Sequence, residues 1–164
     1  MSKIEEYQST IKEQLTFFQR KGEELQENTL RWKPSEDEWS IMEVLCHVKE
    51  FPLYFTHELL LVVKENQQNW GRGLKHEERL AAVEAADQEN LQNVLQEIKA
   101  TQDTVIQRLG QLNDDDLKIV RAHRNPKFGD KPMSFLVDHF LIEHVETHQK
   151  QVERVLKQYS DHIL

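Results

Sequence analysis

The chain has 164 residues, of which 38% are hydrophobic and 30% charged, and its formal net charge is −8 at pH 7. This length and balance predict one soluble domain over residues 1–164, and the scattered Lys and Arg form no basic stripe that would bind nucleic acid. An apolar run of about 18 residues and a secretory signal are both absent, so we expect no membrane association and a cytoplasmic location.

The first predicted helix spans residues 3–27. Apolar residues recur there at intervals that place them on one stripe of a helix with 3.6 residues per turn. They are Ile4, Tyr7, Ile11, Leu15, Phe18 and Leu25. Pro34 and the polar run around it then break the pattern, and Ser40 can cap the helix that follows.

The second predicted helix begins near Ile41 and is apolar on more than one side. We therefore expect it to lie deep between its neighbours. Pro52 falls inside this helix and removes one backbone hydrogen bond, which predicts a kink close to His47. The sequence NQQNWGRGLK ends the helix with two glycines, and HEERLAAVEAADQEN indicates a connector or a short extra helix.

Two further helices complete the predicted fold. Apolar residues follow the helical spacing from Leu91 to Leu109, with Gly110 where a C-terminal cap belongs. Ser134 can cap a last helix that begins at Phe135, and no alternating strand pattern of convincing length occurs. Four long helices with at least one long crossover predict an all-α four-helix bundle, in which facing helices supply the side chains of metal and cofactor sites.

Two histidines lie four residues apart in the last predicted helix, His144 and His148. A turn of about 100° per residue leaves them about 40° apart around the axis. Leu141 and Val155 share that side, so both imidazoles should face the interior of the bundle. Such a pair can bind one metal ion, although two core histidines that pack and hydrogen-bond with each other would show the same spacing.

A third ligand is predicted at His47, on an apolar face of the second helix that also carries Val44 and Phe51. By itself, a histidine on such a face can equally be a hydrogen-bonded core residue. Cys46 is the only cysteine, which excludes a cysteine-based zinc cluster. Its side chain points about 100° away from His47, and we interpret it as a small core residue.

The other histidines are not predicted to be ligands. His139 is about 140° from His144 around the helix and is interpreted as a structural or rim residue. His123 lies in the segment RAHRNPKFG, where it could border the mouth of a pocket. Surface positions are expected for four of them: His57, His76, His123 and His162.

Two segments resemble the DinB-like superfamily of YfiT-type proteins. RWKPSEDEWSIMEVLCHVKEFPLYF resembles the start of its second helix, where W-K-P, an acidic turn, W-S-I and a histidine follow one another. FLIEHVETHQKQVERV resembles its last long helix, where H-x-x-x-H precedes a glutamine and an Ile or Val. The resemblance implies a four-helix bundle, usually a homodimer, in which His47, His144 and His148 hold a divalent metal ion. Pro52 is an unusual residue so close to the first ligand.

Three neutral imidazoles leave an open coordination position on a divalent ion, as in catalytic zinc sites. The resembling superfamily includes S-transferases and isomerases that use a low-molecular-weight thiol such as bacillithiol or mycothiol. We therefore predict a metal-dependent transferase that activates such a thiol for attack on a small electrophile, with zinc as the expected metal and nickel as the alternative. The alternatives are a hydrolase, a non-catalytic metal-binding stress protein, and a dimeric interaction module with core histidines.

Three polar residues are candidates for a supporting role. Glu43 and Glu50 lie within one turn of His47 and could accept a hydrogen bond from its second ring nitrogen, although each could equally be a solvated surface acid. Gln151 lies on the same side of the last helix as His144 and could contact the substrate or form a structural hydrogen bond.

Overall fold

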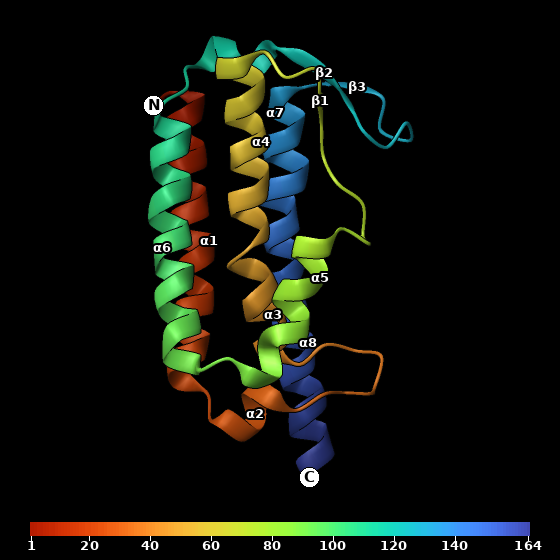
Figure 1. Ribbon diagram of the computed structural model, residues 1–164. Coiled ribbons are helices and arrows are strands. Elements are labelled where there is room, and N and C mark those ends of the chain that lie inside the picture. Colours follow the sequence, from red (N-terminus) through yellow and green to blue (C-terminus); the bar gives the residue numbers. More distant parts are fainter.

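The computed structural model describes residues 1–164 and is mainly helical, with a small sheet at one end (Figure 1). Helix α1 spans Lys3–Glu24, and the hydroxyl of Ser2 caps it by accepting from the Glu5 amide. Its end differs from the predicted residue 27, because Leu25 is extended and a short helix α2, Glu27–Arg31, follows.

The second predicted helix is two helices, α3 (Ile41–Val48) and α4 (Phe51–Glu65). Ser40 caps α3 as predicted, in a reciprocal pair of hydrogen bonds with Glu43. The predicted kink is a break between the two helices at residues 49–50. Pro52 lies in the first turn of α4, where a backbone N–H would have no hydrogen-bond partner within the helix, so proline is tolerated. Asn66, in the left-handed conformation at φ 56°, ends α4 before the predicted glycines.

The connection to the third long helix contains the predicted short extra helix, α5 (Glu77–Glu84), and one 3₁₀ turn, Ala85–Gln88. Helix α6 then spans Leu91–Gly110, close to the predicted range, and Asn90 caps its start. Helices α1 and α6 lie side by side (Figure 1). They approach closely at Gly22, where an added Cβ would lie 2.4 Å from a methyl carbon of Leu95.

The last long helix is assembled from three segments. Helix α7 (Met133–Phe135) leads into a π-helical turn (Leu136–Ile142), which continues as α8 (Glu143–Ile163). The predicted cap at Ser134 is wrong, because the helix begins at Met133 after an extended Pro132 and Ser134 lies inside it. π-Helical turns insert a residue into a helix and are frequent at functional sites.

A three-stranded sheet, absent from the sequence prediction, joins the long connections at one end of the bundle. A 3₁₀ turn at Asp114–Lys118 precedes it, and its strands are β1 (Asn69–Trp70), β2 (Val120–His123) and β3 (Asp130–Pro132). The order is β1-β2-β3, with β1 parallel and β3 antiparallel to β2. Strands of two to four residues are too short to show an alternating pattern.

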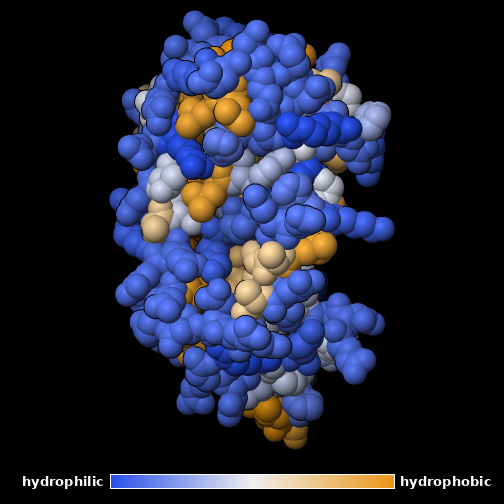
Figure 2. Space-filling view, in the orientation of Figure 1, coloured by the Kyte–Doolittle hydropathy of each residue, from blue (hydrophilic) through white to orange (hydrophobic).

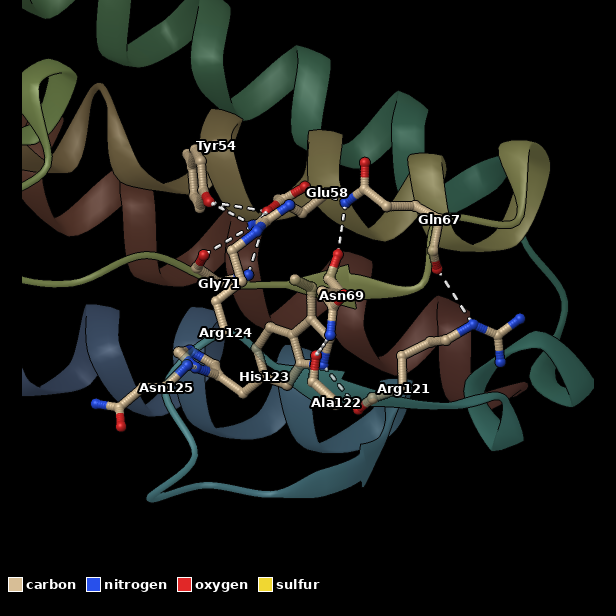
Figure 3. Close-up of polar contacts among 11 residues, drawn as sticks. Tyr54, Glu58, Gln67, Asn69, Gly71, Arg121, Ala122, His123, Arg124 and Asn125 are labelled. Carbon is tan, nitrogen blue, oxygen red and sulfur yellow. Dashed lines mark hydrogen bonds and ion pairs between the residues drawn. The ribbon is translucent and has the colours of Figure 1, made fainter.

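A buried carboxylate on α4, that of Glu58, ties this sheet to the bundle (Figure 3). It accepts hydrogen bonds from the Tyr54 hydroxyl, the Gln67 amide side chain, the Gly71 backbone and the Arg124 guanidinium. Burial by itself raises the pKa of Glu58, but the hydrogen bonds from its partners outweigh burial and hold that pKa below its usual value. The carboxylate is therefore charged, and it links α4 to the residues after β1 and β2.

Apolar side chains from all the long helices form one core, to which the buried Trp70 of β1 also belongs. The face seen in Figure 2 is mostly hydrophilic, with small separate apolar patches. Exposed apolar side chains include Ile163 and Leu164 at the C-terminal end. None of the helices combines the length and the apolar character that crossing a bilayer would require.

Candidate metal centre

The three predicted histidines come together between α3 and α8. His47 lies in the last turn of α3, while His144 and His148 lie one turn apart in α8. One ring nitrogen from each lies within 4.8 Å of the other two. The Nε2 atoms of His47 and His144 are 3.3 Å apart. Two bonds of about 2.0–2.1 Å at a tetrahedral angle place two ligand atoms about 3.3 Å apart, so this pair fits a single ion.

Hydrogen bonds at the second ring nitrogens orient both imidazoles of α8. The Nδ1 atom of His148 lies 2.7 Å from Oε1 of Gln151, and that of His144 lies 3.3 Å from the carbonyl oxygen of Phe140. Both oxygens accept, so each Nδ1 carries the proton and each Nε2 carries a lone pair, which in His144 faces Nε2 of His47. The Nδ1 atom of His47 is buried and has no hydrogen-bond partner. The Nε2 lone pairs of His144 and His148 are therefore available to a metal ion.

Burial keeps the three imidazoles uncharged. His47 is fully buried, His148 is 9% exposed and His144 is half-buried. Burial lowers the pKa of His47 to about 2, with a smaller contribution from the other two histidines, and lowers the pKa of His144 to about 3. Burial also lowers the pKa of His148. At neutral pH all three are therefore neutral, the form in which histidine binds metals.

Two aromatic side chains pack against the cluster. The Phe51 ring stacks on His144 with ring centres 3.9 Å apart. Trp39 lies edge-on to His47 at 5.2 Å and stacked on His148 at 6.1 Å. Packing against these rings limits rotation of the imidazoles.

A surface pocket of about 260 Å³ reaches one of the three ligands, His144. Its other lining residues are His139, Phe140, Glu143 and Thr147. His139 stacks on Phe135, and its Nδ1 lies 3.0 Å from a carboxylate oxygen of Glu143. His139 is thus a rim residue of this pocket, one of its two predicted roles, and the pocket borders the cluster at His144 alone.

The three supporting candidates differ in where they lie. Gln151 contacts a ligand, through Nδ1 of His148. Glu43 is engaged in the cap of α3 and lies 3.6 Å from the ammonium group of Lys33. Glu50 forms a two-pronged ion pair with Arg72. Neither carboxylate hydrogen-bonds to an imidazole. Of the three candidates, only Gln151 therefore contacts a proposed metal ligand directly.

The surface position predicted for His123 is wrong. The side chain is 4% exposed and packs edge-on to Trp70 at 4.6 Å, because the pairing of β1 with β2 covers it. Its Nδ1 accepts a hydrogen bond from the Asn125 amide, and it does not belong to the metal cluster. The short loop-like segment carried no periodic pattern that would have revealed this burial.

Comparison with known proteins identifies the family and the fold of this chain. The family model of the DinB superfamily matches residues 21–152. The fold is similar to that of YfiT from Bacillus subtilis, described as a probable metal-dependent hydrolase with an unusual four-helix bundle topology. That match has a TM-score of 0.79 and 13% identity, and covers 98% of this chain and 90% of YfiT. No curated protein matches the sequence. Because the family model spans most of the chain, this protein belongs to the DinB superfamily.

Proposed function

We propose that this protein is an enzyme that binds one divalent metal ion through His47, His144 and His148 and activates a low-molecular-weight thiol for attack on a small electrophile. The observation that carries the proposal is the convergence of three neutral ring nitrogens within 4.8 Å. Zinc is the expected metal, because three nitrogen ligands with one open position are typical of catalytic zinc, and nickel also accepts imidazole ligands.

A divalent ion at this position would lower the pKa of a thiol or water on its open coordination position. The protein itself supplies orientation and exclusion of water. Gln151 and the carbonyl of Phe140 hold the two imidazoles of α8 in the required tautomer. Phe51 and Trp39 provide apolar walls, which strengthen the electrostatic interactions inside the site.

No carboxylate hydrogen-bonds to His47, His144 or His148. This favours a thiol over water as the nucleophile. Metal-dependent hydrolases of the zinc-protease type use a glutamate as the base that takes the proton of the attacking water. Here Glu43 caps a helix and Glu50 pairs with Arg72. A thiol coordinated to a metal loses its proton outright and needs no such base.

A hydrolase is the second candidate. The description of YfiT favours it, as does the position of Glu143 at the rim of the pocket that reaches His144. Glu143 pairs with His139, and this pair could accept a proton from water at that rim. Hydrolysis of an activated ester without any added thiol would favour this candidate.

One substitution, His144→Ala, tests metal binding and thiol chemistry together. Protein purified without a His tag and stripped of metal should take up one equivalent of zinc, and should conjugate bacillithiol to monochlorobimane. His144→Ala removes one of three ligands, so we expect at least about tenfold weaker zinc binding and loss of most of the conjugation. Zinc content is measured by mass spectrometry and conjugation by fluorescence.

The matched control is His57→Ala, which removes an exposed histidine from α4 and should change neither measurement. A protein that takes up neither zinc nor nickel would contradict the metal site. Conjugation at the same rate in His144→Ala would contradict metal-assisted transfer even if the metal binds.

A further inference from the structure

Two arginines lie near the candidate metal centre, and they differ in their partners. The Arg72 side chain is 3% exposed and forms a two-pronged ion pair with Glu50, which neutralises its charge. Arg79, on α5, donates through Nη1 to the backbone carbonyl of Leu74. It forms no ion pair, and the one acid that favours its charge is Glu50, which already pairs with Arg72. The two arginines and Glu50 together therefore carry one net positive charge.

The fold places Arg79 beside Trp39, whose ring packs against two of the histidines. Helix α5 packs against α3, the helix that carries His47 (Figure 1). The Arg79 guanidinium carbon lies 5.6 Å from the centre of the Trp39 ring, and that ring contacts His47 and His148. The guanidinium and two of the three ligands therefore share one neighbouring ring, that of Trp39.

The charges at this centre do not balance without an anion. Three neutral imidazoles would leave the double positive charge of a divalent ion intact, and Arg79 adds a further positive charge. Placing uncompensated charge in a partly buried site is costly, so a bound molecule that carries negative charge is favoured. The planar guanidinium fork matches the two oxygens of a carboxylate.

We propose that the molecule held at this centre carries a carboxylate group, in addition to the group that reaches the metal, and that Arg79 binds this carboxylate. The inference rests on the proposed metal site and specifies its substrate class. One unpaired guanidinium balances one negative charge, which favours a carboxylate over a doubly charged phosphate. Arg79 thereby determines specificity from a helix that contributes no metal ligand.

The test compares ligands that differ only in this charge. Mercaptoacetate, 3-mercaptopropionate and 4-mercaptobutyrate are titrated into the zinc-loaded protein by calorimetry, each beside its methyl ester. In Arg79→Gln the best-binding acid should lose about tenfold or more in affinity, because a hydrogen bond to a charged group is lost, while its ester keeps the same affinity. Comparing the same acid and ester in both proteins cancels their intrinsic difference in thiol basicity.

Two further variants refine the result. Arg79→Lys keeps the charge without the planar fork and should retain part of the preference for the acid. Lys75→Gln removes an exposed cation from the same connection and should leave all affinities unchanged.

The outcomes separate the two proposals. A protein that binds no zinc would overturn the metal site and this inference with it. Zinc and ester binding with the same preference for the acid in Arg79→Gln would overturn the role of Arg79 and leave the metal site standing. Equal losses for acid and ester in Arg79→Gln would also overturn it, since they would show that Arg79 only supports the fold.

Discussion

Gln151 illustrates how one neutral side chain can prepare a metal ligand. Its amide oxygen accepts the Nδ1 proton of His148 at 2.7 Å, which leaves Nε2 free for the metal. Because Gln151 is neutral, it orients the ring without adding negative charge to the centre. His47 has no such partner, so it depends on packing against Phe51 and Trp39 for its orientation.

The substitution Gln151→Ala should weaken zinc binding by about 10- to 100-fold, the usual effect of losing a hydrogen bond that orients a ligand. The affinity can be measured by competition with a chromophoric chelator. Gln107→Ala removes an exposed glutamine from α6 and serves as the control. If both variants bound zinc as tightly as the unchanged protein, Gln151 would have no supporting role.

At the scale of elements, the contact of β1 with β2 depends on a glycine. Gly71 follows β1 with φ 91°, and its amide donates to the Glu58 carboxylate. A Cβ at this position would lie 2.1 Å from Nε2 of His123. Gly71 therefore allows the buried imidazole of His123 to pack against the backbone. The sequence alone predicts instead that this glycine ends a helix.

Gly71→Ala should lower the free energy of unfolding by about 2–5 kcal/mol, since it combines a strained backbone with overpacking. Gly129, with φ 67° and open space around it, separates these effects. Gly129→Ala should cost only about 1–2 kcal/mol, the strain alone. Urea unfolding measures both, and equal losses in the two variants would contradict the close packing at His123.

For the whole molecule, a metal at this centre would join helices that are far apart along the chain. His47 and His144 are separated by 97 residues, and one ion would bridge α3 and α8. An ion that binds the native state and not the unfolded chain stabilises the fold in proportion to its affinity. Metal binding and stability should therefore be linked.

Zinc at 100 times its dissociation constant should stabilise the protein by about 2.7 kcal/mol. For a chain of this size that corresponds to a rise of roughly 5–10 °C in the unfolding temperature. Differential scanning calorimetry with and without zinc measures the rise, and a chelator should reverse it. The same rise in His144→Ala would mean that zinc stabilises the protein from another site.

The helical periodicity of the sequence was sufficient to predict the bundle. The apolar stripes of α1 and α6, the cap at Ser40 and the interruption at Pro52 depend on neighbours in the chain, and each lies at or close to its predicted position. The spacing of His144 and His148 is a property of one helix, so their common direction was also predictable. Local geometry decides all of these features.

Only the tertiary structure decided how distant segments meet. The strands of the small sheet form because residues 69–70 pair with residues about fifty positions later, and this pairing buries His123. Arg79 lies on a short polar helix, and its position near the histidines follows from the packing of α5 on α3. The sequence by itself determined the helices and the candidate ligands, because these depend on local spacing. Packing between segments far apart in the chain determined the surroundings of the centre and its charge.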